Sequence, residues 1–281
     1  MSYMLRSAVV GLTALVAVST GSAMAQEKGK LEEVLERGHL IVGTGSTNAP
    51  WHFKDESGNL VGFDVDVAKL VAKGLFGDDT KIEFVDQSSD SRIPNVTTGK
   101  VDITCQFMTV TAERAQQVNF TIPYYREGVA LLVSAGGKLK TYDELKKAGS
   151  GATVSVLQNV YAEDMVHAAL PEAKVDQYDS VDLIYEALNS GRADAAATDQ
   201  SSAKWLIVTT PGKYLDSGYG WNPQSYSCAV KRGDQDWLNF VNTTLHEAMT
   251  GVEFGTYSAS FKKWFGVELA PPAIGFPVEY Q

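Results

Sequence analysis

Two charged residues of this 281-residue chain lie where α/β proteins bind ligands. Arg114 follows the apolar segment VDITCQF and falls in the first turn of an expected helix, where an acidic residue is the usual choice. Asp199 directly follows a second such segment, ADAAAT. Ligands of open α/β sheets bind beyond the carboxyl ends of the strands, so both residues are candidates for one site.

An arginine and an aspartate in one cleft would suit a zwitterion. The guanidinium group donates two parallel hydrogen bonds to a carboxylate, and the aspartate accepts hydrogen bonds from an ammonium group. The hydroxyls of Thr109 and Thr111, with backbone amides at the helix start, would complete the carboxylate site. A structural interpretation stays open at this point: Arg114 as a solvated helix arginine and Asp199 as a helix N-cap.

Other kinds of chemistry have little support in the sequence. The 4 histidines are scattered, and no pair has the spacing of metal ligands. There is no phosphate-binding loop ending in Gly-Lys-Ser/Thr and no Gly-x-Ser-x-Gly elbow. The chain carries 24 Lys and Arg against 34 Asp and Glu, a net charge of −10 that argues against nucleic acid. We expect no metal, no cofactor and no nucleic-acid partner.

The N-terminal residues 1–25 have the pattern of a cleaved signal peptide. One base, Arg6, precedes an apolar run from Ala8 to Val18, and the segment ends in the small-x-small pattern Ala-Met-Ala. The run is shorter than the roughly 20 residues that span a bilayer. We expect cleavage after Ala25 and a soluble exported protein; a retained membrane anchor is the alternative.

The mature chain would hold two cysteines, Cys105 and Cys228. Export would place them where disulfides persist, and an even count leaves none over if they bond. Spacing alone does not show that they meet, so a disulfide and two buried free thiols remain equal alternatives.

Strands and helices alternate along the chain in two series. The first contains the segments HLIVGTG, FDVDVAKLVAKGLFG, KIEFVD, RIPNVTTGK and VDITCQF, and the second runs from ATVSVLQ to DQSSAKWLIV. Such alternation predicts mostly parallel sheets covered by helices. The apolar segments GVALLVSA and SYSCAVKRG flank the second series and are expected to link two lobes. Two aromatic-faced C-terminal helices are expected to pack back on the first lobe.

Several motifs together resemble one family. The segments GNLVGFDVDVAKLVA, RIPNVTTGKVDIT, TVTAERAQQVNFTIPYY, SGRADAAATD and MTGVEFGTYSASFKKWFG are similar to those of the periplasmic amino-acid-binding proteins of ABC importers, family 3 of the bacterial extracellular solute-binding proteins. The resemblance covers essentially the whole mature chain, in the family's order. It implies a two-lobed α/β fold of the type II periplasmic binding proteins, each lobe a mostly parallel sheet flanked by helices.

The same resemblance implies how the chain is divided. Residues 26–128 and 231–281 would form the first lobe, and residues 136–222 the second. Segments 129–135 and 223–230 would be the two hinge strands. The protein would bind its ligand as a monomer in the periplasm.

By motif position, the resemblance also assigns roles to residues. Arg114, supported by Thr109, would bind the ligand α-carboxylate, and Asp199 the α-ammonium. Arg92 in SSDSRIP resembles an arginine of the glutamate/aspartate-binding branch that contacts the side-chain carboxylate. A surface arginine at a helix start is the alternative interpretation of Arg92.

Three departures from the family concern the side-chain end of the site. Many relatives carry an aromatic lid where this chain has Asn48, and Trp51 is the candidate substitute. Phe107 stands where a small hydroxyl residue is common. The segment LQNVYAED lacks the family's threonine hydroxyl, although Asn159, Val160 and Tyr161 are expected to offer backbone amides.

The expected function is capture of a polar, acidic amino acid, glutamate or aspartate, by hinge closure, followed by delivery to a membrane permease and its ATPase. The main alternative is a periplasmic enzyme similar to cyclohexadienyl dehydratases, for which Glu163 is the nearest candidate acid. A ligand-sensing protein that reports to a membrane receptor is a third possibility.

Overall fold

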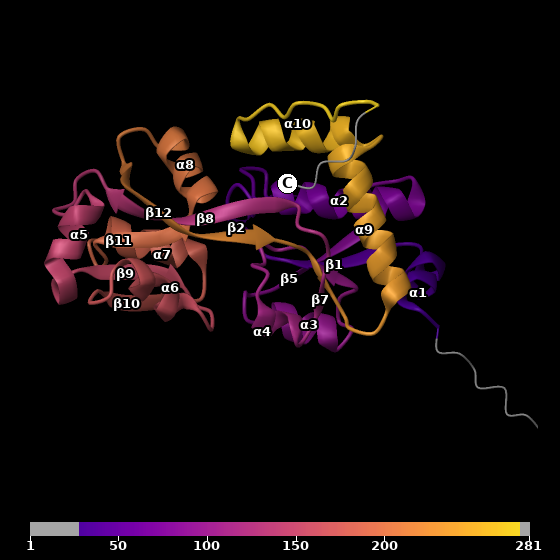
Figure 1. Cartoon of the computed structure of the whole chain (residues 1–281), viewed down its shortest axis with the longest axis horizontal. Coiled ribbons are helices and arrows are strands. Elements are labelled where there is room, and N and C mark those ends of the chain that lie inside the picture. The colour runs from indigo at the N-terminus through magenta and orange to yellow at the C-terminus, as the bar shows by residue number, and fades with distance from the viewer. Residues whose placement is uncertain (1–27, 276–281) are drawn as a thin grey trace, which may run out of the picture.

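Two five-stranded sheets organise the computed structural model, which describes residues 28–275 (Figure 1). The segment expected to be a signal peptide lies outside these residues. Among them, no helix combines the length and the apolar character that crossing a membrane requires.

The first sheet has the strand order β5-β1-β6-β13-β7. The strands are β1 (Leu40–Thr44), β5 (Ile82–Asp86), β6 (Ile103–Thr104), β7 (Asn119–Phe120) and β13 (Ala229–Val230). β1 pairs in parallel with β5 and β6, whereas β13 is antiparallel to both of its neighbours. The helices of this lobe are α1 (Lys30–Arg37), α2 (Phe63–Phe76), α3 (Arg92–Thr97), α4 (Ala112–Ala115), α9 (Gln235–Thr250) and α10 (Phe254–Phe265). A small sheet of β2 (Thr47–Asn48), β3 (His52–Lys54) and β4 (Leu60–Val61) completes it.

The second sheet has the order β10-β9-β11-β8-β12. Its strands are β8 (Tyr125–Ser134), β9 (Thr153–Leu157), β10 (Lys174–Tyr178), β11 (Ala195–Asp199) and β12 (Tyr214–Tyr226). The helices are α5 (Tyr142–Ala148), α6 (Ala162–Ala169), α7 (Val181–Asn189) and α8 (Gln200–Thr209), with a 3₁₀ turn at Gly149–Gly151. A capping box between Thr141 and Glu144 opens α5.

Two long antiparallel strands, β8 and β12, connect the lobes (Figure 1). They pair as far as Tyr125 and Tyr226, next to the first lobe. Residues 129–133, expected in the first hinge strand, instead pair with β11 inside the second sheet. Their unbroken apolar run reflects a central strand buried on both faces. The first crossing therefore lies before residue 129.

The C-terminal helices return to the first lobe, as predicted from their aromatic faces. Their buried residues join one core with those of α2 and β1. Trp264 of α10 donates its indole N–H to Asp66 Oδ2 of α2 at 2.7 Å, and Ser260 donates to the same oxygen at 2.6 Å. The first lobe is thus built from both ends of the described chain.

A disulfide joins Cys105 to Cys228, with the two Cα atoms 4.4 Å apart. Cys105 follows β6 and Cys228 precedes β13, and these two strands are neighbours in the first sheet. Both side chains are fully buried. The bond therefore fastens the returning chain to the first lobe, and the free-thiol alternative does not describe this structure.

Candidate functional site

A cavity of about 770 Å³ lies between the two lobes. Its walls include most of the residues predicted for the site: Asn48, Arg92, Phe107, Thr109, Arg114, Asn159 and Asp199. They come from both lobes, from the ends of β2 and β11, the short helices α3 and α4, and the loops between such elements.

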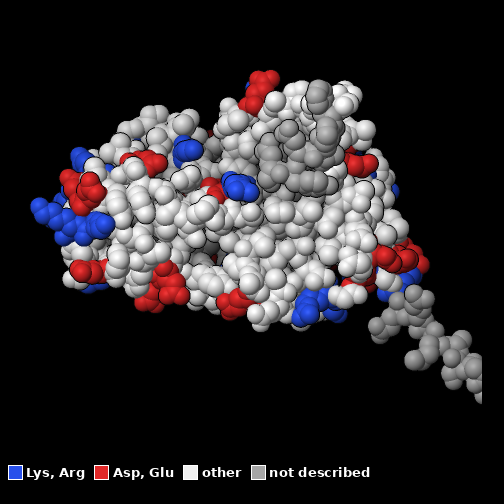
Figure 2. Space-filling view, viewed as in Figure 1, with Lys and Arg blue, Asp and Glu red and all other residues white. Residues whose placement is uncertain are grey.

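On the face shown in Figure 2, basic side chains lie scattered among acidic ones and form no single basic patch.

Arg114 lies at the cavity wall with 7% of its surface exposed. Thr111 caps α4 by accepting the backbone N–H of Arg114 at 3.2 Å. The guanidinium Nη1 donates to the Thr109 carbonyl at 3.0 Å, and no described acidic side chain pairs with it. Burial lowers the pKa of Arg114. Its remaining N–H groups are available to a ligand carboxylate, and α4, with four residues, has little dipole to oppose the charge.

Arg92 begins α3 and is 4% exposed, so it is not a surface arginine. Its Nε donates to the Ser89 carbonyl at 2.8 Å and its Nη1 to the Gln106 carbonyl at 3.1 Å. The guanidinium carbon lies 5.4 Å from the ring centroid of Phe107. Burial, together with the nearby charge of Arg114, lowers the pKa of Arg92 to about 9, which leaves it cationic at neutral pH. Two cations therefore share the cavity.

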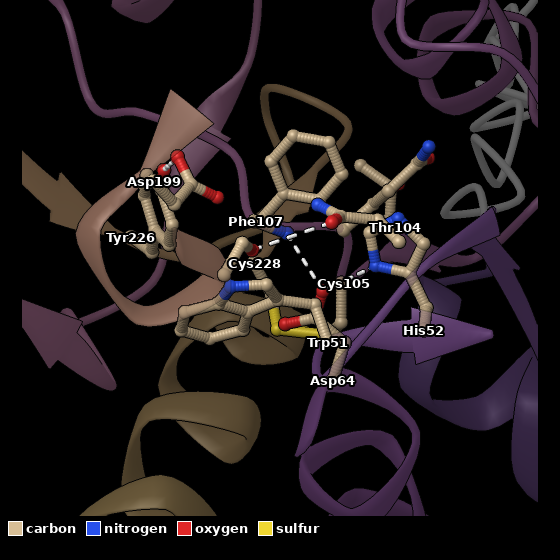
Figure 3. A network of polar contacts seen from close by, with 12 residues as sticks. Trp51, His52, Asp64, Thr104, Cys105, Phe107, Asp199, Tyr226 and Cys228 are labelled. Carbon is tan, nitrogen blue, oxygen red and sulfur yellow. Dashed lines mark hydrogen bonds and ion pairs between the residues drawn. A yellow bond between two sulfur atoms is a disulfide. The ribbon is translucent and has the colours of Figure 1, made fainter. Parts of the chain in front are cut away.

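Asp199 ends β11 and occupies the N-cap position of α8, but its side chain makes no capping hydrogen bond. Instead Oδ1 accepts the hydroxyl of Tyr226 at 2.5 Å (Figure 3). Burial raises the pKa of Asp199 well above its usual value, and the negative charge of Glu127 raises it further. A ligand ammonium placed here would offset both effects.

The other predicted wall residues are held by neighbours. Thr109 donates its hydroxyl to Gln224 Oε1 of β12 at 2.9 Å. The side chain of Asn48 is buried and accepts a hydrogen bond from Ser202 of α8 at 3.3 Å, which spans the two lobes. Asn159 Oδ1 accepts the backbone N–H of Tyr161 at 3.0 Å. That amide, expected to serve the ligand, is therefore already used.

Trp51 and Val160 do not line the cavity. Trp51 is fully buried, and its ring packs edge-on against Phe63, Tyr125 and Tyr226. The indole N–H donates to Ser201 Oγ at 3.0 Å. Because this ring is held in the core, Trp51 is not a lid. Val160 is 74% exposed and is not among the residues that line the cavity.

A buried carboxylate behind the cavity was not anticipated. Asp64 accepts the Phe107 backbone N–H at 2.8 Å and lies 2.7 Å from His52 Nδ1 (Figure 3). Asp64 also accepts the Tyr124 hydroxyl at 2.6 Å. Phe107 adopts φ +32°, a strained value for a residue with a side chain. The His52 ring stacks on the Phe107 ring at 4.6 Å. The sequence alone indicates only that Asp64 is an acidic residue in the first turn of a helix, where acids are common.

Residues 40–267 match the family model of the bacterial extracellular solute-binding proteins, family 3. The chain belongs to this family. Like the type II binding proteins among its structural neighbours, this solute-binding protein has two α/β lobes. Among its described residues, no three His, Cys, Asp or Glu side chains gather as metal ligands would.

Relatives of this solute-binding protein are named for several amino acids. An ABC transporter glutamine-binding protein of Bacillus subtilis is 29% identical over 248 residues, 88% of each chain. An L-cystine-binding protein of Escherichia coli K12 is 29% identical over 267 residues, 94% of this chain and 97% of the relative. The crystal structure of an ancestral amino acid-binding protein, a precursor of cyclohexadienyl dehydratase, shares 34% identity and a TM-score of 0.74, over 84% of this chain and 99% of that one.

The acid considered for an enzymatic alternative lies away from the cavity. Glu163 is exposed in the first turn of α6 and does not line the cavity. The relatives above are named as binding proteins. Glu163 therefore has no position in the wall of this cavity from which it could contact a ligand.

Proposed function

We propose that this protein captures an acidic α-amino acid, glutamate or aspartate, in the periplasm and delivers it to a membrane permease–ATPase complex. The observation that carries the proposal is the placement of Arg114, Asp199 and Arg92 in the wall of one cavity. A ligand with one ammonium and two carboxylates would give each of these charges an opposite partner.

Recognition of the ligand's α-carboxylate and α-ammonium groups is better supported than recognition of its side chain. Arg114 has free N–H groups and forms no ion pair within residues 28–275, and Asp199 is a buried carboxylate whose charged form needs compensation. Charge-assisted hydrogen bonds contribute about 1.5–3 kcal/mol each. Glutamine and cystine, the ligands named for two relatives, share this α-amino acid group.

The acidic preference rests on Arg92. Its two bonds to backbone carbonyls fix the guanidinium group at the cavity wall, and its other N–H groups face no described carboxylate. A second carboxylate on the ligand would neutralise it. An uncharged side chain would leave a nearly buried cation without a counter-charge, which is costly.

Closure of the cleft would rotate the two lobes about the segments of β8 and β12 that connect them. The pair Tyr125–Tyr226 lies at the boundary, and Tyr226 also contacts Asp199. Asp199, the proposed ammonium-binding residue, therefore lies next to the proposed hinge. The closed monomer, with its ligand held between the lobes, would be the form that docks on the permease.

Isothermal titration calorimetry with each of the twenty amino acids tests the proposal. We expect L-glutamate or L-aspartate to bind with a dissociation constant of about micromolar or tighter, roughly −8 kcal/mol. L-Glutamine and L-asparagine are the matched neutral controls and should bind more weakly. Tighter binding of a neutral or basic amino acid would remove the acidic assignment, and no binding of any would remove amino-acid capture.

A further inference from the structure

The side chain of Tyr161 crosses the cleft between the lobes. Tyr161 precedes α6 in the second lobe, and its hydroxyl lies 2.6 Å from Glu113 Oε2 and 2.9 Å from Thr111 Oγ1 in the first. The carboxylate can only accept, so the phenol proton goes to Glu113 and the Thr111 hydroxyl donates to the phenol oxygen. Thr111 in turn accepts the backbone N–H of Arg114. The phenol oxygen of Tyr161 and the hydroxyl of Thr111 thus each donate one hydrogen bond and accept another.

The ring of Tyr161 covers the proposed carboxylate-binding group. The guanidinium carbon of Arg114 lies 5.2 Å from the ring centroid, within the range of a cation–π contact. Both residues line the same cavity. The ring thus shields from solvent a cation that makes no ion pair within residues 28–275.

These contacts require the two lobes to be together. Tyr161 is carried by the loop between β9 and α6, both in the second lobe, whereas Thr111, Glu113 and Arg114 lie at α4 between β6 and β7 of the first. Any opening of the cleft that separates α4 from α6 breaks both hydrogen bonds and removes the ring from Arg114. The interaction therefore favours the closed state alone.

We propose that Tyr161 is the lid of the ligand site: its ring closes over Arg114, and its hydroxyl latches the second lobe to α4. The inference rests on the proposed function, because it places the ligand carboxylate at Arg114. Asn48 offers no ring and is bonded to Ser202, so the aromatic cover comes from the opposite lobe. Ligand escape must break the latch, and the latch therefore acts on the dissociation rate more than on association.

Two substitutions separate the latch from the ring. Tyr161→Phe keeps the ring and removes the hydroxyl, whereas Tyr161→Ala removes both. Tyr178→Phe, in the same lobe, is the matched control, because its hydroxyl forms no hydrogen bond in the described structure. Trp51 and Trp205 contact residues of the other lobe, so tryptophan fluorescence reports closure.

Stopped-flow fluorescence with L-glutamate measures the effect. We expect Tyr161→Phe to raise the dissociation rate roughly tenfold, as loss of one hydrogen bond to a carboxylate implies, and Tyr161→Ala to raise it further. Combining Tyr161→Phe with Glu113→Gln should add little, because both act on the same bond. An unchanged dissociation rate in Tyr161→Phe, with Tyr178→Phe as reference, would overturn the latch.

A crosslinking arm tests the geometry without any ligand. The described native cysteines are both in the disulfide, so Tyr161→Cys combined with Glu113→Cys introduces the only reactive pair within residues 28–275. A short bismaleimide should join them within one chain, whereas the single variant Glu113→Cys has no second free thiol in the described residues and should give no such product. If no amino acid binds the wild type, the proposed function fails while this arm still decides the latch. Failure of this pair to crosslink would overturn it.

Discussion

Burial makes the charged side chains of the cavity dependent on a ligand. Arg92 and Arg114 are both nearly buried cations, and Asp199 is a carboxylate whose pKa burial raises. Each charge is costly without a partner in a poorly solvated site. A ligand with opposite charges would relieve these costs on binding, and the proposed site would then select for charge as well as for shape.

Replacing Arg92 by alanine should therefore change selectivity. We expect Arg92→Ala to weaken L-glutamate binding by about 1.5–3 kcal/mol, roughly tenfold to a hundredfold, because one charge-assisted contact is lost. Binding of L-glutamine should change much less. Calorimetry with both ligands measures the difference, and Arg192→Ala, an exposed residue of the second lobe, is the control. Equal losses for both ligands would assign Arg92 a structural role.

Acidification should weaken ligand binding through Asp199. Its ordinary pKa is 3.8, and burial raises the pKa in the folded protein, so the protonated form gains as pH falls through that raised value. Protonated Asp199 no longer attracts an ammonium group. The sign for the empty protein is opposite: a raised carboxyl pKa favours folding at low pH and loses that contribution as pH rises.

Calorimetry from about pH 8 down to about pH 5 would measure this linkage. We expect the dissociation constant to increase on acidification, with proton release on binding in the lower part of the range. The Asp199→Asn variant should bind weakly with a flatter pH dependence. A constant affinity across the range would show that another group accepts the ammonium.

At the scale of elements, very short strands and helices position the side chains of the cavity wall. β6 has two residues and α4 four, yet α4 carries Arg114, and the loop between the two elements carries Phe107 and Thr109. The Cys105–Cys228 disulfide joins the ends of β6 and β13 directly behind these loops. The bond therefore supports a region that has few strand hydrogen bonds of its own.

Removing the disulfide should destabilise the protein measurably. We expect the double variant Cys105→Ala and Cys228→Ala to lose about 2–4 kcal/mol in free energy of unfolding. Urea denaturation followed by circular dichroism measures the change, with the oxidised wild type as reference. Ligand affinity should also fall, because the segment from Cys105 to α4, which carries Arg114, loses its support. An unchanged midpoint would mean that the strand pairing alone holds the region.

Local patterns predicted many elements but not the contacts between distant ones. Apolar periodicity located α2, α9 and α10, and motif order placed Arg114 and Asp199 in one cavity. β12 was largely missed because its sequence, YLDSGYGWNPQSY, is polar and contains Gly and Pro at the edge of a sheet. Trp51 was misassigned because local spacing does not show whether an indole enters the core. The lid role of Tyr161 depends on partners some 50 residues earlier.

At the scale of the whole molecule, both lobes contribute residues to one ligand cavity. The cavity walls come from both, and contacts such as Trp51–Ser201 and Asn48–Ser202 also span them. Ligand therefore stabilises the folded, closed arrangement as a unit. Neither lobe alone presents Arg114 and Asp199 together.

Thermal and chemical unfolding should reflect this shared site. We expect L-glutamate at a hundredfold excess over its dissociation constant to raise the free energy of unfolding by about 2.7 kcal/mol. The Arg114→Ala variant should fold normally and show no such rise. Differential scanning calorimetry with and without ligand measures it. A ligand-dependent shift that persists in Arg114→Ala would place the carboxylate elsewhere.

The return of α9 and α10 to the first lobe also orders events during biosynthesis. The second lobe, from β8 to β12, is one continuous stretch of chain and holds all of its own strands. The first lobe lacks β13, α9 and α10 until the last part of the chain has been made. When the chain appears N-terminus first, all residues of the second lobe are therefore present before the first lobe has its last strand and helices.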